Sequence, residues 1–303
     1  MIPHLPLTLD PAAAVRALAD ALAAGLDPET APPRTAVPVP AGELLLMPAA
    51  AGRYAGVKIA GVAPANPGRG LPRITGGYLL LDGPTLQPLA LLDGASLTAL
   101  RTPAVTALAL DRLAVPDARH LVLFGTGPQA YGHLAALLAV RPLELVTVVG
   151  RRRGPAEELA AHARSRGTAA AVGGPDAVAE ADLVVCCTTA RSPLFDGRLV
   201  APHAAVAAVG SHEPDAREVD TALVRRSALY AEARSAALRE AGDLVAAFAE
   251  DGPVPLANLS ELVTGAAVVP HDRPRLFKSV GMAWEDLAVA AAQYESTTGL
   301  GAT

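Results

Sequence analysis

The chain has 303 residues, of which 51% are hydrophobic and 18% charged, and its formal net charge is -5. This composition is too apolar for a disordered chain, and its acidic balance argues against broad nucleic-acid binding. No apolar stretch reaches the ~20 residues that span a bilayer, and the first residues lack the features of a secretory signal. Because Cys186 and Cys187 are adjacent, they cannot form a disulfide framework. We therefore expect a globular protein of the cytoplasm with about two domains.

The first hundred residues predict a short helix followed by a strand-rich region. Asp10 is a candidate N-cap for a helix over 11–22, with Pro11 at the first helical position. Strands separated by proline and glycine turns are then predicted near 43–47, 56–62, 77–81 and 86–92. A turn-rich loop lies between 64 and 70, and a helix runs from Ser96 to about Leu113. This part predicts a smaller α+β domain over 1–112.

A strand–helix alternation begins at His120. Short apolar runs predict strands at 121–124, 145–149, 169–172, 183–187 and 204–209, with helices at 129–139 and 156–166. Such alternation predicts a Rossmann-type, doubly wound parallel sheet over 113–282. After Leu229 the pattern is mainly helical, and a loop holding 277–279 leads into a final helix from about Trp284 to Tyr294.

A glycine-rich turn follows the first strand of this region. Gly125, Gly127 and Ala130 match the GxGxxA dinucleotide fingerprint, in a segment that also contains Thr126 and Gln129. The first glycine allows the tight turn, the second admits a pyrophosphate, and the alanine keeps helix and strand close. The sequence therefore predicts a bound dinucleotide; a glycine turn in an α/β domain without a nucleotide is the alternative.

The end of the second strand indicates which dinucleotide is bound. An acidic residue there would hydrogen-bond the ribose of NAD, whereas an arginine accommodates the 2′-phosphate of NADP. The chain has Arg151 and Arg152 at this point, and no acid before Glu157. We predict that NADP(H) is favoured and NAD(H) possible. The alternative reading is a solvated arginine cluster.

Three basic residues of the first domain are candidate anion ligands. All but two of the 25 basic residues are arginine, and the two lysines are Lys58 and Lys278. Strand alternation places Lys58 on the face opposite Val57 and Ile59. Together with Arg34 and Arg101, Lys58 would bind a carboxylate strongly if the three met in one cleft. Taken singly, each is an ordinary surface charge.

At this point the chain resembles the ornithine cyclodeaminase/mu-crystallin family over nearly its full length. The resemblance rests on Arg34, Met47-Pro48, Lys58, Asn66, 70–72, 91–94, 97–102, 125–127, Gln129-Ala130, His133, 277–281 and 284–288. It implies a homodimer whose N-terminal domain binds the substrate and carries the subunit interface, with the helix of 283–303 returning to that domain. It also implies that Arg34, Lys58 and Arg101 hold a substrate carboxylate. Thr188, Ser279, Val280 and Gly281 would lie near the cofactor.

Two positions depart from the pattern of the cyclodeaminases. Leu45 stands where those enzymes carry a glutamate, and His212, in Gly210-Ser211-His212-Glu213-Pro214, stands where they carry a catalytic aspartate. Cyclodeamination needs an anionic environment and a base for the attacking amine, and these changes weaken both, although Glu213 could substitute. A histidine titrates near neutral pH, so His212 suits the acid that keeps an imine nitrogen protonated. The alternative is that His212 caps a loop.

The predicted function is hydride transfer between NADP(H) and the α-carbon of a small imino or amino acid, with Lys58 and His212 as catalytic residues. Two alternatives stay open. One is ornithine cyclodeaminase, a lyase that releases ammonia without net change in the cofactor. The other is a non-catalytic protein that binds a ligand in the presence of NADPH. We predict no metal, no nucleic acid and no membrane among its partners.

Overall fold

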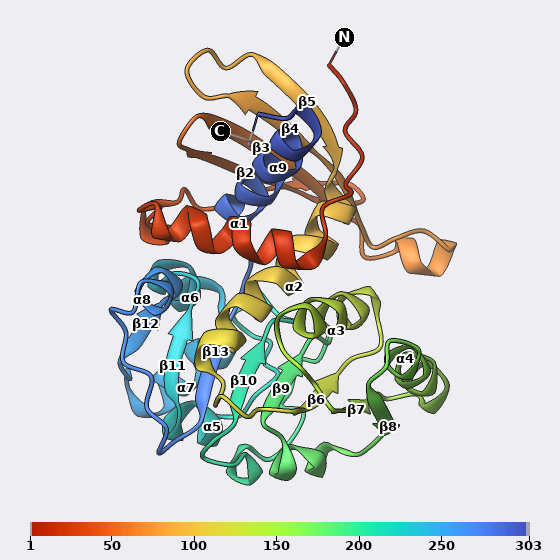
Figure 1. Cartoon of the computed structure of the whole chain (residues 1–303), viewed down its shortest axis with the longest axis vertical. Helices are drawn as coiled ribbons and strands as arrows, with labels where there is room; N and C mark the ends of the chain where they lie inside the picture. Colours follow the sequence, from red (N-terminus) through yellow and green to blue (C-terminus); the bar gives the residue numbers. More distant parts are fainter. Residues whose placement is uncertain (1, 301–303) are drawn as a thin grey trace. The chain divides into compact units, whose positions relative to one another are not determined.

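The computed structural model describes residues 2–300, in which the chain forms two compact units (Figure 1). Unit 1 takes in Met1–Thr102 and Met282–Thr303, and unit 2 takes in Pro103–Gly281. The division falls within helix α2 (Gly94–Leu113). No helix in the described range is long and apolar enough to cross a membrane.

Unit 1 is built on a five-stranded antiparallel sheet whose strands follow one another in chain order. The strands are β1 (Thr35–Val39), β2 (Gly42–Ala51), β3 (Tyr54–Val62), β4 (Ile74–Asp82) and β5 (Pro88–Asp93). The four predicted strands are confirmed, whereas β1 was not expected. Short 3-10 turns, η1 (Pro28–Thr30) and η2 (Asn66–Arg69), lie before β1 and between β3 and β4.

Two helices of unit 1 complete its core. Helix α1 (Pro11–Ala23) begins as predicted, because an Asp10 carboxylate oxygen accepts a hydrogen bond from the Ala13 N–H at 2.8 Å. The C-terminal helix α9 (Ala283–Thr298) packs against β2, β3 and α1, as Figure 1 shows for the blue helix beside the sheet. The two ends of the chain therefore share one core.

The sheet of unit 1 has two different faces. Residues directly opposite one another in the register share a face, and Met47, Lys58 and Tyr78 form one such row on the buried side. Lys58 is only 3% exposed, whereas its neighbour Ile59 is 45% exposed on the other side. The alternation predicted for Lys58 is thus confirmed. The second face carries apolar side chains that are exposed (Val37, Leu44, Ile59 and Leu91) or half-buried (Leu46, Val57 and Leu79).

Unit 2 contains an eight-stranded parallel sheet in the order β12-β11-β13-β10-β9-β6-β7-β8. The strands are β6 (His120–Phe124), β7 (Leu145–Val149), β8 (Ala169–Val172), β9 (Leu183–Cys186), β10 (Ala205–Ala208), β11 (Ala228–Ala231), β12 (Leu256–Asn258) and β13 (Arg275–Lys278). The helices are α3 (Pro128–Val140), α4 (Arg153–Ser165), α5 (Thr221–Arg226), α6 (Arg234–Glu240), α7 (Gly242–Asp251) and α8 (Leu259–Val263), with 3-10 turns η3 (Pro175–Glu180) and η4 (Gly197–Leu199). The strand order reverses direction between β6 and β9, so the predicted doubly wound sheet is confirmed.

The prediction for the region after Leu229 was wrong in part. The sequence pattern placed 277–279 in a loop, whereas Phe277 and Lys278 belong to β13, which lies between β11 and β10. Strand β13 was missed because a charged residue stands at each end of it. Both are buried: Arg275 donates to the backbone carbonyls of Leu113 and His203, and Lys278 pairs with a carboxylate.

Candidate functional site

Unit 1 contains a buried cluster of two cations and two carboxylates. The Lys58 Nζ lies 2.9 Å and 2.7 Å from the two carboxylate oxygens of Asp286, and it also donates to the Thr98 hydroxyl at 3.3 Å. The Arg101 guanidinium donates to the same Asp286 at 3.1 Å and to Glu285 at 2.5 Å. The structure therefore brings Lys58 and Arg101 onto one shared carboxylate, supplied by α9.

The charges in this cluster balance. Two positive and two negative side chains, none more than 5% exposed, leave no formal net charge. Burial and, to a smaller extent, the nearby Arg101 lower the pKa of Lys58 to about 8, although Asp286 opposes the shift. A lysine with such a pKa changes its charge within reach of neutral pH, which an arginine does not.

Arg34 lies at the edge of the same sheet face. It is half-buried and immediately precedes β1, in which Thr35 is paired with Leu46. Continued by one residue, this register sets Arg34 level with Met47, whose other neighbour is Lys58. Two strand spacings of ~4.8 Å place the backbones of Arg34 and Lys58 roughly 10 Å apart. A long arginine side chain spans much of that distance.

The buried face next to Lys58 is otherwise apolar or neutral. Leu45 is 7% exposed and faces the same side as Met47, two residues away on β2. The Tyr78 side chain is fully buried, and its hydroxyl has no hydrogen-bond partner within residues 2–300. Burial raises the pKa of Tyr78 well above its usual value, and Asp286 adds to the shift, so Tyr78 stays neutral.

The glycine turn of unit 2 has the geometry that a dinucleotide requires. Gly125 has a φ of +120°, and a Cβ there would lie 2.8 Å from the Cys187 carbonyl oxygen. By contrast, nothing lies within 4 Å of a Cβ built on Gly127, the N-cap of α3. The turn thus combines a close backbone approach with open space at the positive end of a 13-residue helix. The geometry at Gly125 and Gly127 is compatible with the predicted pyrophosphate site, for which Thr126, Gln129 and Ala130 remain predictions.

Arg151 and Arg152 lie after β7 and are exposed. Neither side chain has a hydrogen-bond or ion-pair partner in the described part of the chain, although the Arg152 backbone caps α4. Arg153, the next residue, lies 3.6 Å from Glu157 in an exposed ion pair. Two adjacent guanidinium groups are therefore available to an anion at the end of this strand.

A buried carboxylate, Glu218, joins the ends of β9 and β10. One of its oxygens accepts hydrogen bonds from the backbone N–H and the hydroxyl of Thr188, each at 2.7 Å. The other accepts from the Gly210 N–H at 2.7 Å. A Cβ on Gly210 would lie 2.1 Å from the Thr188 carbonyl oxygen, so only glycine fits this approach. Glu218 thereby fixes Thr188, which the sequence placed near the cofactor.

The backbone at Glu218 is held by hydrogen bonds to a second buried acid, Asp243. Asp243 accepts hydrogen bonds from the Glu218 N–H at 2.7 Å and the Val219 N–H at 2.9 Å. The other Asp243 oxygen lies 2.7 Å from the Lys278 Nζ, which also donates to the Ser211 carbonyl at 2.8 Å. The chain's second lysine is thus, like the first, fully buried against an aspartate.

The loop after β13 is held by Glu232. Its carboxylate accepts hydrogen bonds from the Ser279 hydroxyl at 2.5 Å and from the N–H groups of Val280 and Gly281 at 2.9 Å and 3.0 Å. Glu232 is 1% exposed and belongs to the segment that follows β11. The three predicted cofactor residues 279–281 therefore share one carboxylate.

The segment with His212 lies at the end of β10. His212 is exposed, while its neighbour Ser211 is buried. Glu213, which could replace the missing aspartate of a cyclodeaminase, lies 2.7 Å from the Arg191 guanidinium. Glu213 is therefore already engaged with a cation.

The sequence analysis missed the acids of both units. They are Glu218, Glu232, Asp243, Glu285 and Asp286, and each is no more than 1% exposed. The sequence offers little signal for them: Glu218, for example, stands next to Arg217 and close to Asp220, as a solvated acid would. Glu285 and Asp286 were cited for the family resemblance without a role.

Two histidines expected to be structural have the contacts of structural residues. The His133 ring nitrogens contact the Gln129 carbonyl at 2.7 Å and the Thr106 hydroxyl at 3.0 Å, and burial lowers the pKa of His133 to about 4. His120 contacts the Thr147 hydroxyl at 2.9 Å. Both cysteines are free thiols, and burial raises the pKa of each. Among the described residues, no cluster of three or more His, Cys, Asp or Glu side chains forms a metal site.

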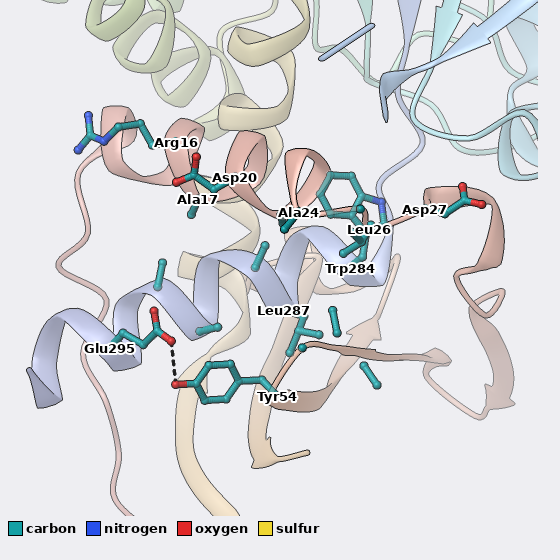
Figure 2. A pocket seen from close by; sticks show the side chains of 18 of the residues that line it. Arg16, Ala17, Asp20, Ala24, Leu26, Asp27, Tyr54, Trp284, Leu287 and Glu295 are labelled. Carbon is teal, nitrogen blue, oxygen red and sulfur yellow. Dashed lines mark hydrogen bonds between the residues drawn. The ribbon is translucent and has the colours of Figure 1, made fainter. Parts of the chain in front are cut away.

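A cavity of about 750 Å³ in unit 1 lies apart from these residues (Figure 2). It is lined by α1, α9 and the β2–β3 turn, largely by alanines, and it includes Trp284 and Tyr54. The Tyr54 hydroxyl donates to Glu295 at 3.0 Å, the contact dashed in Figure 2, and burial raises the pKa of Tyr54 to about 12. None of Arg34, Lys58 and Arg101 lines this cavity.

Comparison with known proteins gives consistent matches. The family model described as ornithine cyclodeaminase/mu-crystallin matches residues 10–300. Delta(1)-pyrroline-2-carboxylate reductase 2 of Burkholderia ambifaria is 38% identical over 85% of this chain and 82% of its own length. Ketimine reductase mu-crystallin of Mus musculus is 35% identical over 88% and 84%. The structure of Thermococcus litoralis Delta(1)-pyrroline-2-carboxylate reductase with NADH and L-proline is similar at a TM-score of 0.90, with 29% identity and 98% of each chain covered.

Proposed function

The chain belongs to the ornithine cyclodeaminase/mu-crystallin family, and from this premise we propose that it is an NAD(P)H-dependent reductase of small cyclic ketimino acids. The family relation and the reductase names of its relatives support hydride transfer at the α-carbon of an imino or amino acid. The substrates named in those relatives, such as Delta(1)-pyrroline-2-carboxylate, define the class to be tested first.

Unit 1 is the proposed substrate-binding domain. Arg34, Lys58 and Arg101 hold the substrate carboxylate, and the shared contact of Lys58 and Arg101 with Asp286 fixes both cations before the substrate arrives. Such preorganisation avoids the cost of ordering flexible side chains during binding. Arg34 is the third cation proposed to contact the substrate carboxylate.

Proton transfer is the second task of the site. A bound reduced nicotinamide supplies the hydride, and a protonated imine accepts a hydride more readily than a neutral one. His212, which is exposed at the end of β10, is the proposed acid that keeps the imine nitrogen protonated. Lys58, with a pKa of about 8, is cationic at neutral pH and holds the carboxylate in that state.

The observation that carries the choice of reduction over cyclodeamination concerns two described positions, 45 and 213, neither of which offers a diamine an unpaired carboxylate. Leu45 is apolar and buried on the Lys58 face, and Glu213 is paired with Arg191. A diamine substrate would bring a second ammonium group, and these positions offer it no unpaired acid. A ketimine carries no second ammonium group, so it matches this environment better.

Unit 2 is the proposed dinucleotide domain. The turn at Gly125 and Gly127 supports binding of the pyrophosphate. Residue 188 follows β9, the strand next to β6, and residues 279–281 follow β13, two strands further along the same sheet. We propose NADPH as the preferred cofactor, because Arg151 and Arg152 are exposed and have no acidic partner. Free thiols at Cys186 and Cys187 fit a reducing compartment such as the cytoplasm.

The proposed assembly is a homodimer formed through the apolar sheet face of unit 1. Val37, Leu44, Ile59 and Leu91 are each 36–45% exposed on this one face, which is unusual for a solvated sheet. We expect sedimentation to give a dimer for the unaltered chain and a monomer for Ile59→Lys. Leu86→Lys changes an equally apolar but separate residue, 62% exposed in the β4–β5 turn, and should stay dimeric. A dimeric Ile59→Lys variant would contradict this interface.

Enzyme assays with matched substrates test the function. Delta(1)-pyrroline-2-carboxylate and Delta(1)-piperideine-2-carboxylate are each mixed with NADPH or NADH, and the absorbance of the reduced cofactor is followed. The proposal predicts one oxidised cofactor for each imine consumed, faster with NADPH. Ammonia release from ornithine without net cofactor change would identify a cyclodeaminase. Tight NADPH binding without turnover of any of these substrates would identify a binding protein.

A further inference from the structure

Buried acids outnumber buried bases at the carboxyl ends of the unit 2 strands. Glu218, Glu232 and Asp243 are all at most 1% exposed, and Lys278 is the buried cation that contacts them, through Asp243. The Lys278 ammonium therefore compensates one carboxylate. Glu218 is joined to this pair through the backbone contacts of Asp243, and its own oxygens contact no cation in the described residues.

The hydrogen bonds of Glu218 are those of an ionised carboxylate. All three groups that contact its oxygens are donors: the Thr188 N–H, the Thr188 hydroxyl and the Gly210 N–H. The two N–H groups can only donate, one to each Glu218 oxygen, so both oxygens are placed as acceptors, as in an ionised carboxylate. Burial raises the pKa of Glu218, while Lys278 and these donors oppose the shift.

The end of β9 connects Glu218 to the glycine turn, because Thr188 contacts Glu218 and the preceding Cys187 contacts the turn. Strand β9 is paired with β6, and the Cys187 carbonyl oxygen, one residue before Thr188, would touch a Cβ on Gly125. The charge of Glu218 also raises the pKa of the Cys187 thiol, after burial. In doubly wound sheets, ligands bind outside the carboxyl ends of the strands where the order reverses, here between β6 and β9.

We propose that Glu218 stabilises the oxidised, cationic nicotinamide relative to the reduced, neutral one, and so favours hydride transfer from the cofactor to the ketimine. The inference rests on the proposed function. When a hydride leaves the reduced ring, the ring gains one positive charge and the protonated imine loses one. A buried negative charge lowers the free energy of the state in which the ring is cationic, and low-dielectric surroundings strengthen the effect.

Binding of the two cofactor forms, without any substrate, tests this role. Glu218→Gln keeps the shape of the side chain and removes its charge. The dissociation constants of NADP⁺ and NADPH are measured for each protein by titration calorimetry. We expect Glu218→Gln to raise the ratio of the NADP⁺ constant to the NADPH constant by about five- to tenfold.

Two further variants keep the experiment decisive. Asp182→Asn removes a carboxylate at the opposite end of β9, where Asp182 accepts hydrogen bonds from the Arg119 and His120 N–H groups. Asp182 lies six residues before Thr188, a distance of up to about 20 Å in extended chain. Its ratio should equal that of the unaltered chain. Lys278→Met removes the compensating cation, so its ratio should change in the opposite direction to that of Glu218→Gln. The change of this ratio in Lys278→Met can be measured even if Glu218→Gln does not fold.

The possible outcomes distinguish a failure of this inference from a failure of the reductase proposal. Equal weakening of both cofactor forms in Glu218→Gln would show a purely structural role and overturn the inference, as would a ratio matching Asp182→Asn. Either result would leave the reductase proposal intact. Failure of the unaltered chain to bind either form would instead overturn the proposed function, and the inference with it.

Discussion

The cations proposed to bind substrate and those proposed to bind cofactor differ in how they are held. Lys58 and Arg101 are buried and already paired with Asp286. Arg151 and Arg152 are exposed, and no side chain in the described range pairs with them. Buried, oriented charges act strongly and resist screening by salt, whereas exposed charges act weakly and are screened. The two sets should therefore respond very differently to substitution.

The largest effect is expected for Lys58→Met. The variant loses the ammonium that positions the substrate carboxylate, and kcat/KM for the ketimine should fall by about a hundred- to a thousandfold, or about 3–4 kcal/mol. The dissociation constant of NADPH, which we assign to unit 2, should stay the same. Steady-state kinetics of the folded variant measure kcat/KM, and titration calorimetry measures the dissociation constant of NADPH.

The loss must be separated from simple unfolding. Removing one partner of a buried ion pair costs about 3–5 kcal/mol of stability, so circular dichroism at the assay temperature is the necessary control. Unchanged kcat/KM in a folded Lys58→Met protein would remove Lys58 from the site.

A smaller, pH-dependent effect is expected for Asp286→Asn. The Asp286 carboxylate raises the pKa of Lys58 against the effect of burial, so its loss should move that pKa further below about 8. The protonated lysine binds the carboxylate, and it predominates below the pKa. The unaltered enzyme should therefore lose kcat/KM as the pH rises through about 8, and the variant should lose it at a lower pH.

Glu285→Gln is the matched comparison for this profile. Glu285 contacts Arg101 rather than Lys58, and among the groups that act on the Lys58 pKa its contribution is smaller than that of Asp286. The alkaline limb of its kcat/KM profile should move less. An identical limb in all three proteins would show that another group titrates there.

This comparison also shows what the sequence could and could not predict. Periodicity alone placed Lys58 on the face opposite Val57 and Ile59, and the alternation of strands and helices predicted the parallel sheet. Spacing could not reveal that Asp286, 228 residues away in the chain, shares its carboxylate between Lys58 and Arg101. Such long-range pairs depend on how α9 packs on the sheet, and no local pattern encodes that packing.

Strand β13 illustrates a different limit. A local apolar run predicts a buried strand, but here Arg275 and Lys278 occupy its two ends and are themselves buried. Their charges are satisfied by carbonyl groups and by Asp243, which come from distant segments. The same reason explains why Glu218 and Glu232 were missed: a buried acid is recognisable only when its donors are known.

The smallest effect is expected for Arg151→Glu, because its guanidinium is exposed. The variant should lose about tenfold of the preference for NADPH over NADH, measured as the ratio of the two kcat/KM values, since a carboxylate repels the 2′-phosphate. Arg152 retains part of the attraction.

Arg153→Glu is the matched control. It makes the same charge change at the exposed first residue of α4, which is paired with Glu157, and it should leave the ratio almost unaltered. Rising salt should also weaken the preference in the unaltered enzyme, as it would not weaken a buried contact. If Arg151→Glu and Arg153→Glu gave equal ratios, the selectivity would come from elsewhere, and the contrast between buried and exposed cations would apply to the substrate alone.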